Sequence, residues 1–160
     1  MILKPRTTCR ICNSTQLSTI MSLGDQHIAA YTPRASDPNP ILDKFPLELI
    51  RCTEPDCGLV QLRHSTPGNV LYERYFYRSG INKTMTENLK EIAMQAISKV
   101  ELQDNDIVLD IGCNDGTLLK NYQGKNLRSV GIDPAKNMAE FSKECGADII
   151  VDYFNSKSFT

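Results

Sequence analysis

Short apolar runs alternate with glycine-containing turns in the last third of the chain. Three runs, at 107–111, 128–133 and 149–152, are too short for helices and predict buried strands. Residues 117–122 and 135–145 lie between them and have the spacing of short helices. This alternation predicts an α/β fold with a parallel sheet, the first part of a Rossmann-like domain. Ligands of such sheets bind at the carboxyl ends of the strands.

Each predicted strand carries an aspartate at its carboxyl end, namely Asp110, Asp133 and Asp152. Asp133 lies 21 residues after Gly112, close to the spacing of about 20 at which nucleotide-binding sheets place a ribose-binding carboxylate. A single aspartate at such a position is more often a helix cap or a solvated loop residue. Three in phase favour a rim of carboxylates along one edge of the sheet.

The turn after the first of these strands carries the pattern Asp110-x-Gly112-x-Asn114-Asp115-Gly116. Its glycines allow a tight turn and close approach of a ligand. Asn114 stands where a dinucleotide-binding fingerprint has its second glycine, which a pyrophosphate requires. The pattern resembles the first motif of class I S-adenosylmethionine (SAM) methyltransferases. A carboxylate there repels a phosphate but suits a cationic, amino-bearing cofactor.

The N-terminal half has a different pattern, with short strands and a proline-rich stretch. Residues 17–23 predict a strand, and residues 31–46, with four prolines, predict an irregular loop. Residues 45–52 and 59–62 predict a hairpin. A module this small is expected to need a metal or another cross-link to stay folded.

Four cysteines supply that cross-link in two pairs, Cys9-x2-Cys12 and Cys52-x4-Cys57. Four thiolates from two turns suit a closed, tetrahedral, structural zinc site. The gap of 39 residues between the pairs exceeds the usual 15 to 20, so an insertion must loop out. The alternative is four unliganded cysteines in a small core. His27 and His64 lie in no ligand-spaced pair and are interpreted as ordinary loop or surface residues.

Between the two halves lie an aromatic segment, residues 72–80, and a predicted helix. The segment is either packing between modules or a lid of tyrosines and arginine over a polar ligand. Thr84 and Glu87 form a capping box that predicts the start of the helix. Its apolar stripe is expected to pack on the sheet and consists of Met85, Leu89, Ile92, Ala93, Ala96, Ile97 and Val100.

Composition narrows the class of protein. The 160 residues carry a net charge of −1, and residues 1–80 hold nine Lys/Arg against seven Asp/Glu, so we expect no nucleic-acid partner. No apolar run approaches 18 residues, which predicts no membrane span. The N-terminus does not resemble a signal peptide, so we expect a cytoplasmic protein with metal-bound or free thiols rather than disulfides. The predicted organisation is a zinc-binding module at 1–70, an aromatic segment and connecting helix at 71–103, and a SAM-binding part at 104–160.

The order of these parts resembles the SAM-dependent C-methyltransferases that act on nucleotide-linked deoxysugars, which have an N-terminal zinc module. The residues that carry the resemblance are the cysteine pairs and the stretches 57–62, 75–82 and 110–119. The second pair has four intervening residues where two are usual. The resemblance implies that a base removes a proton beside a 4-keto group and that the resulting carbanion takes the SAM methyl.

The resemblance also implies roles for single residues. Tyr75 and Tyr77 would line the catalytic site, and Tyr77 would also touch the cofactor. The expected SAM-binding residues are Tyr77, Asp110, Gly112, Asn114, Asp115, Gly116, Asp133, Pro134, Asp152, Tyr153 and Phe154. Among them the 112–116 turn would hold the methionine end, Asp133 the ribose and 152–154 the adenine. The catalytic base of such enzymes corresponds to a position beyond residue 160.

Two other functions remain open at this stage. One is a zinc-containing RNA methyltransferase, and the other is a non-catalytic zinc-binding fragment. A complete class I methyltransferase sheet has about seven strands, and only three are predicted here. We therefore expect a fragment of a longer protein, inactive by itself, whose uncovered sheet is covered by further chain or by self-association.

Overall fold

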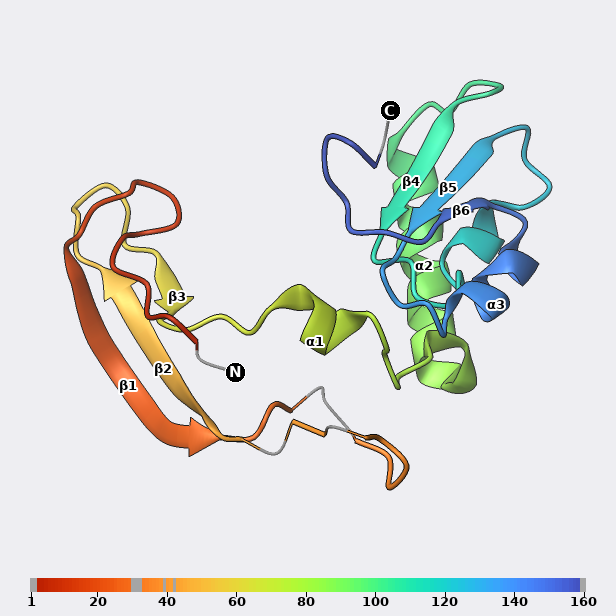
Figure 1. Cartoon of the computed structure of the whole chain (residues 1–160). Helices are drawn as coiled ribbons and strands as arrows, with labels where there is room; N and C mark the ends of the chain where they lie inside the picture. The colour runs from red at the N-terminus through yellow and green to blue at the C-terminus, as the bar shows by residue number, and fades with distance from the viewer. Residues whose placement is uncertain (1–2, 30–32, 39, 42, 159–160) are drawn as a thin grey trace. The chain divides into compact units, whose positions relative to one another are not determined.

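The computed structural model describes residues 3–29, 33–38, 40–41 and 43–158. The chain divides into two compact units, Met1–Leu71 and Tyr72–Thr160. Each unit contains one three-stranded sheet (Figure 1). The fold is therefore mixed α/β, as the sequence predicts.

The first unit is an antiparallel sheet in the order β1-β2-β3, formed by Leu17–Gln26, Phe45–Cys52 and Val60–Leu62. The short helix α1, Gly68–Tyr72, follows this sheet, and its last residue is the first residue of the second unit. The predicted hairpin of residues 45–62 is confirmed as the β2–β3 pair, and the first predicted strand extends to Gln26. Of the predicted loop 31–46, residues 31, 32, 39 and 42 lie outside the described residues. The described remainder as far as residue 44 contains no helix or strand, as predicted for a loop.

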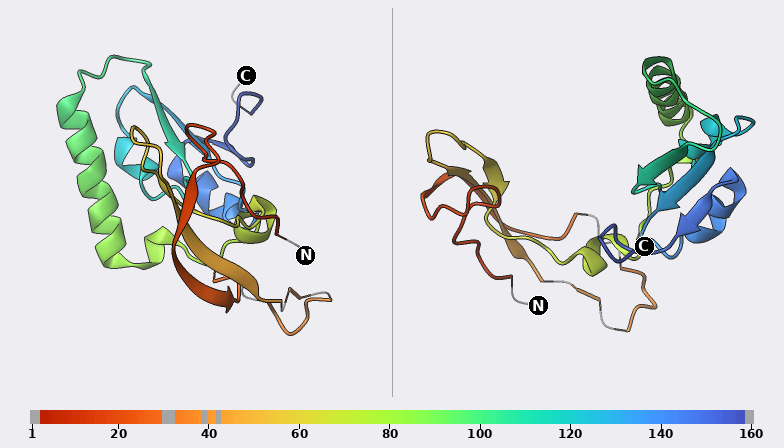
Figure 2. Two further views of the ribbon diagram at one scale, coloured as in Figure 1. Left: turned by 90° about the vertical axis from the view of Figure 1, so that its left-hand side faces the viewer. Right: turned by 90° about the horizontal axis from the view of Figure 1, so that it is seen from above.

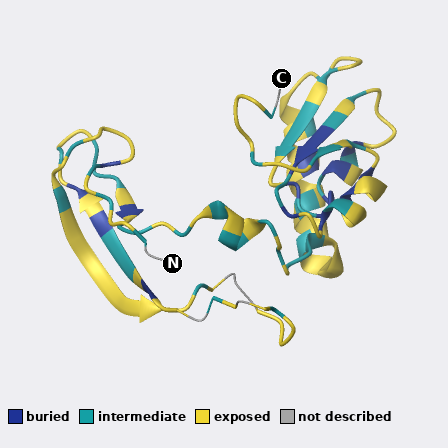
Figure 3. Ribbon diagram, viewed as in Figure 1, coloured by how far each residue is buried: buried dark blue, intermediate teal, exposed yellow. Residues whose placement is uncertain are grey.

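The first unit has little apolar core. Among the described residues of this unit, the buried apolar side chains are Ile50, Cys52, Cys9 and Phe45. Figure 3 shows β1 exposed along almost its whole length, in agreement with its burial pattern. Because so few side chains are buried, this unit depends on a cross-link for its stability.

The second unit contains a parallel sheet in the order β4-β5-β6, formed by Ile107–Ile111, Arg128–Ile132 and Asp148–Ile150. The right-hand view of Figure 2 shows the three strands side by side, with the helix α2, Lys83–Lys99, on one side of them. The three predicted strands and their parallel pairing are confirmed. The last one begins one residue early and ends at Ile150, before Asp152.

The second unit has a small apolar core beside its sheet. Its buried members include Cys113, Leu119 and Cys145, and half-buried apolar residues of β4, β6 and the adjoining turns pack around them. On the edge strand β4, Ile107 and Ile111 are more than half exposed. The expectation that further chain or a second copy covers the sheet stays a prediction.

The helix predicted at 117–122 is wrong in type, because only a 3-10 helix, η2, forms over Leu119–Tyr122. The backbone N–H of Asn121 binds Leu118 O at 3.1 Å instead of Thr117 O. The Asn121 side-chain amide donates to both of these carbonyl oxygens, at 3.1 Å each. A side chain that binds its own turn in this way competes with α-helical hydrogen bonds.

The predicted helix 135–145 is also shorter than expected. It is a four-residue helix α3, Ala139–Ser142, followed by the 3-10 helix η3, Lys143–Cys145. The segment before it makes tertiary contacts instead, since Lys136 N–H binds Glu73 O at 3.1 Å. Gly146 follows in the left-handed conformation that is typical of the residue after a helix end, with φ of 74°.

Helix α2 follows the 3-10 helix η1, Ser79–Ile81, and begins earlier than the predicted capping box. Asn82 is the N-cap, and its Oδ1 accepts the Met85 N–H at 3.1 Å, so the assignment of Thr84 as N-cap and Glu87 as N3 is wrong. The predicted stripe is buried only at Ala93, while Met85, Leu89 and Ile97 are half-buried and Ile92, Ala96 and Val100 are exposed. The reason is that α2 packs on η1 and η2, which cover a small part of the stripe.

Candidate functional site

Four sulfur atoms meet at one end of the first unit. The Sγ atoms of Cys9, Cys12, Cys52 and Cys57 all lie within 4.8 Å of one another. Cys9 lies 3.6 Å from Cys57, and Cys12 lies 3.6 Å from Cys52. A tetrahedral zinc with Zn–S bonds of about 2.3 Å separates its sulfurs by about 3.8 Å. The four residues therefore fit zinc.

Local turns position the two cysteine pairs. In the first, Asn13 N–H binds Cys9 O at 3.1 Å, and Asn13 has a positive φ of 60°. In the second, Cys52 ends β2 and Gly58 follows Cys57 with φ of 63°. The longer spacing of the second pair does not prevent convergence, because Cys57 N–H binds Glu54 O at 3.1 Å and closes the turn.

The thiols of the cluster differ in acidity. Backbone N–H groups of Cys12 and Ile11 lower the pKa of Cys9 to about 6, against burial, with the Gln61 and Cys57 side chains acting in the same direction as the N–H groups. At Cys52 the Glu54 N–H lowers the pKa, but burial and the neighbouring thiols raise it to about 12. Zinc binds thiolates, so its uptake releases the protons that such thiols retain.

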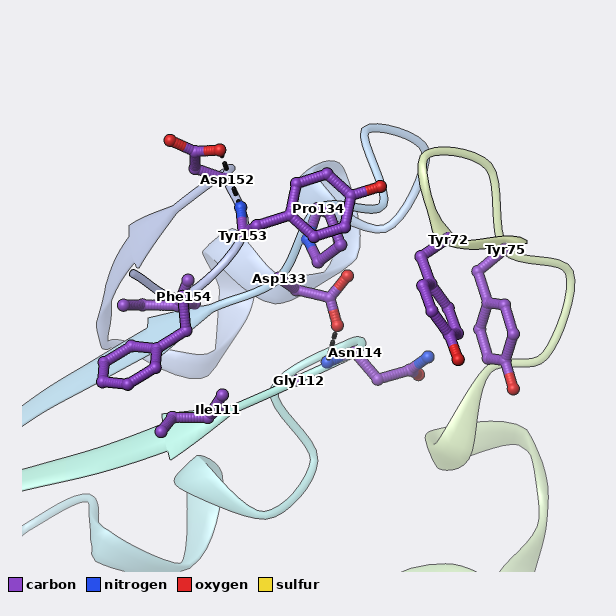
Figure 4. Close-up of a pocket in the computed structure, with 11 residues that line it drawn as sticks. Tyr72, Tyr75, Ile111, Gly112, Asn114, Asp133, Pro134, Asp152, Tyr153 and Phe154 are labelled. Atoms are coloured by element: carbon purple, nitrogen blue, oxygen red, sulfur yellow. Dashed lines mark hydrogen bonds between the residues drawn. The ribbon is translucent and has the colours of Figure 1, made fainter. Parts of the chain in front are cut away.

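A pocket of about 350 Å³ opens at the carboxyl edge of the parallel sheet in the second unit (Figure 4). Residues from β4, β5, the segment after β6 and the aromatic segment line it. They are Tyr72, Tyr75, Ile111, Gly112, Asn114, Ile132, Asp133, Pro134, Asp152, Tyr153 and Phe154. A parallel sheet is expected to carry its ligand at this edge.

Asp133 follows β5 directly and is held by the backbone on both sides. Its Oδ2 accepts the Asn114 N–H at 2.9 Å, and its Oδ1 accepts the Ala135 N–H at 2.8 Å. Each carboxylate oxygen keeps lone-pair capacity for one further donor. The side chain is thus fixed in the pocket as a ready acceptor, and it also acts as a turn cap.

The two glycines of the turn, Gly112 and Gly116, have different structural roles. Gly112 has φ of 82°, and an added Cβ there would meet nothing within 4 Å. Gly116 has φ of 74°, but its Cβ would stand 2.6 Å from Cys145 Cβ. Gly112 therefore leaves room for a ligand, whereas Gly116 allows the turn to pack against the core.

Four residues expected in the site do not line this pocket, namely Tyr77, Asp110, Asp115 and Gly116. Asp110 lies within β4 beside Gly131, and its pKa is raised by burial and by the nearby Asp133. Asp115 is 4% exposed, and its carboxylate accepts the Gly80 N–H at 2.8 Å and the Thr117 N–H at 3.2 Å. Asp115 therefore stabilises the turn and the aromatic segment and does not face the pocket.

The aromatic segment lies against this turn. Asn114 donates from Nδ2 to Tyr77 O at 2.9 Å, and its Oδ1 accepts the Ser79 N–H at 3.0 Å. Arg78 has its guanidinium carbon 4.2 Å from the Phe141 ring centroid and its Nε 3.7 Å from Asp115. The sequence motifs of the segment and of the turn therefore bind one another.

The segment also binds the loop before α3, because the Asn137 side chain bonds both backbone groups of Tyr75, at 2.9 and 2.7 Å. The Tyr72 and Tyr75 rings stand 6.3 Å apart on one wall of the pocket. Tyr72, Ile111 and Ile132 were absent from the sequence-predicted site. The three-residue spacing of Tyr72 and Tyr75 could have indicated a shared face.

The opposite wall consists of Asp152, Tyr153 and Phe154, as Figure 4 shows. Tyr153 N–H binds Asp152 Oδ1 at 2.7 Å. The pKa of Tyr153 is raised by burial and by nearby Glu73, so its phenol stays protonated at neutral pH. His27 and His64 lie neither in the cysteine cluster nor in this pocket.

The two sites define a zinc-binding module followed by an α/β unit with a ligand pocket. Residues 9–72 match the family Methyltransf_13, described as "Putative zinc binding domain". Over 156 residues, 98% of its length, the chain is 26% identical to C-methyltransferase NovU of Streptomyces niveus, and it spans 37% of that protein. The expected resemblance to C-methyltransferases with an N-terminal zinc module is thereby confirmed. Among the described residues, no helix has the length and apolar character of a membrane span.

Proposed function

We propose that the pocket of the second unit binds SAM and that the protein transfers the SAM methyl group to a carbon atom. The observation that carries this is Asp133, a carboxylate held by two backbone N–H groups at the carboxyl edge of a parallel sheet. In this position it can accept both ribose hydroxyls. The similarity to a C-methyltransferase supports the reaction class.

The chemistry of the pocket fits SAM better than a phosphate-bearing cofactor. Two carboxylates, Asp133 and Asp152, line it, and they would repel a pyrophosphate but attract the cationic sulfonium and ammonium groups. Ile111, Ile132 and Phe154 offer apolar contact for the adenine. The open space at Gly112 suits the methionine end.

Bound SAM supplies a methyl group that its sulfonium has already activated. We propose a nucleotide-linked 4-keto-deoxysugar as acceptor. In such a reaction a base would remove a proton from the carbon beside the keto group, and that carbon would take the methyl group, with S-adenosylhomocysteine as the leaving group. The contribution of this chain is orientation of the reactants. We assign Tyr72 and Tyr75 to contact with them, and Tyr153, a protonated phenol, to the cofactor wall.

Asp133→Ala should weaken SAM binding by about 1.5–3 kcal/mol, the scale of losing hydrogen bonds to a charged group. Calorimetric titration with SAM and with S-adenosylhomocysteine measures the change. Asp133→Asn keeps one acceptor oxygen and separates the loss of charge from the loss of the turn cap. Asp148→Ala is the matched control, because this carboxylate is exposed at the start of β6.

Two results would overturn the proposal. One is equal affinity of the wild type and both Asp133 variants for SAM. The other is tighter binding of NAD than of SAM, since Asp133 would then serve as the ribose-binding carboxylate of a dinucleotide site. Methyl transfer itself is tested by incubation with SAM and a 4-keto-deoxysugar nucleotide and by mass spectrometry of the product.

A further inference from the structure

Asn114 connects the two parts of the pocket that face the ligand. Its backbone N–H holds the Asp133 carboxylate, while its side chain holds Tyr77 O and Ser79 N–H. The side chain thus accepts one hydrogen bond from the aromatic segment and donates another to it. An amide is the side chain that can do both in a fixed geometry.

The backbone conformation of Asn114 allows its side-chain hydrogen bonds to be removed without loss of its backbone hydrogen bond to Asp133. Its φ is 49°, in the left-handed region that asparagine and glycine adopt most readily. Replacement by glycine therefore keeps the turn and the N–H to Asp133. Only the two side-chain bonds to the aromatic segment are lost.

We propose that Asn114 is a positioning residue that couples the Asp133 carboxylate to the aromatic segment, so that ligand bound at Asp133 orders the wall of Tyr72 and Tyr75. The identity of the ligand in this inference rests on the proposed function. The two side-chain hydrogen bonds of Asn114 to the aromatic segment, called the anchor below, do not depend on it. The coupling is reciprocal: an ordered segment also favours the ligand. The Gly80 N–H also donates to Asp115 of the turn, and the Asn137 side chain, in the loop before α3, binds both backbone groups of Tyr75, so the segment stays attached when Asn114 is changed.

Amide hydrogen exchange measured residue by residue tests the anchor without ligand. In Asn114→Gly the Ser79 amide should exchange about five- to tenfold faster, the scale of one lost hydrogen bond. The Gly112 amide, which binds Ile132 O at 2.7 Å, is the internal reference and should not change. Unchanged exchange at Ser79 would overturn the anchor.

Titration with S-adenosylhomocysteine tests the coupling. Saturating ligand should slow Ser79 exchange in the wild type but not in Asn114→Gly, although the variant still binds through Asp133. Equal slowing in both proteins would overturn the coupling. Failure of the wild type to bind any adenosyl ligand would instead overturn the proposed function, and the ligand-free comparison would still decide the anchor.

A separate observation concerns Gln61, which lies on β3 opposite Ile50 and is 6% exposed. Arg10 holds its Oε1 twice, from the backbone N–H at 3.2 Å and from Nη1 at 2.9 Å. The Arg10 guanidinium is itself fixed on Leu62 O and Ser65 Oγ. With its oxygen occupied in this way, the amide has its orientation determined.

The Nε2 group of Gln61 is buried and has no hydrogen-bond partner among the described residues. A buried donor of this kind calls for an acceptor. The Cys9 thiol belongs to the residue directly before Arg10, whose backbone N–H binds this same Gln61 amide at Oε1. We infer that Gln61 donates to the Cys9 thiolate of the zinc-loaded site and fixes its orientation.

Zinc affinity tests this inference independently of any enzymatic activity. Gln61→Glu keeps an acceptor for Arg10 but turns an oxygen towards the thiolate, so zinc affinity should fall by about 10- to 100-fold, the usual effect of losing an outer-shell partner. Competition with a chromogenic chelator measures it. The absorption of the Co2+-loaded variant shows whether all four thiolates still bind.

Gln16→Glu is the matched control, because Gln16 is exposed and gains the same charge. It should keep nearly wild-type zinc affinity. A second variant, Gln61→Ala, removes the amide without adding charge and should also weaken binding. Wild-type zinc affinity in Gln61→Glu, or equal losses in Gln61→Glu and Gln16→Glu, would overturn the role of the amide.

Discussion

Removal of zinc is expected to unfold the first unit of the protein. The unit buries few apolar side chains, whereas structural zinc contributes about 10–16 kcal/mol in small zinc-binding peptides. Treatment with a chelator, or the change Cys52→Ala, should abolish amide protection in β1, β2 and β3. Protection in β4 and β5 should persist, because those strands belong to the other unit. Elemental analysis should find one zinc per chain before treatment.

Cys113→Ala provides the matched control for the cysteine substitution. Cys113 is equally buried, but it lies in the core of the second unit, where burial raises the pKa of its thiol to about 12. This variant should retain one zinc per chain and the protection of the first unit. A zinc content well below half an equivalent in the wild type, or an intact first sheet after chelation, would contradict the prediction.

Gly116→Ala should destabilise the second unit by about 2–5 kcal/mol. A non-glycine residue in the left-handed region costs about 1–2 kcal/mol, and crowding in a packed core adds about 1–3. Here the added Cβ would stand 2.6 Å from Cys145 Cβ and 2.7 Å from Cys145 Sγ. Exchange of the buried amides of β5, measured at increasing urea, reports the free energy of unfolding of this unit.

Gly124→Ala separates the two contributions. Gly124 has nearly the same φ, 75° against 74°, but an added Cβ there would meet nothing within 4 Å. Its cost should be that of the backbone alone, about 1–2 kcal/mol. Equal losses of stability in the two variants would show that crowding of the added Cβ against Cys145 adds nothing to the cost of the Gly116 substitution.

The sequence predicted the elements whose signals are local. The strands after residue 100 are short apolar runs bounded by polar turns, and the cysteine pairs are close in sequence. The helices next to the sheet were predicted less well. In the helix predicted at 135–145, Met138, Phe141 and Cys145 have helical spacing, and of these Met138 and Cys145 are buried whereas Phe141 is exposed. Tertiary bonds from Lys136 and Asn137 replace the first helical turn.

The candidate site shows the same division. The position of Asp133 followed from strand periodicity and places it in the pocket. The inward orientation of Asp115 could not be predicted from the sequence, because it depends on Gly80 and Arg78, which lie more than 30 residues earlier. A glycine pattern likewise does not distinguish a residue that faces a ligand, such as Gly112, from one that faces the core, such as Gly116. These differences are set by contacts between segments remote in sequence.

The β1–β2 hairpin follows the first pair of zinc ligands and ends on Cys52 of the second pair, so the metal closes a loop whose described residues between Cys12 and Cys52 contribute no ligand. The entropy of closing such a loop rises only with the logarithm of its length, and a doubling costs about 0.6 kcal/mol. That amount is small beside the free energy of zinc binding. The far end of the hairpin is consequently a place where whole peptides can be inserted or removed while the metal-bound end keeps its structure.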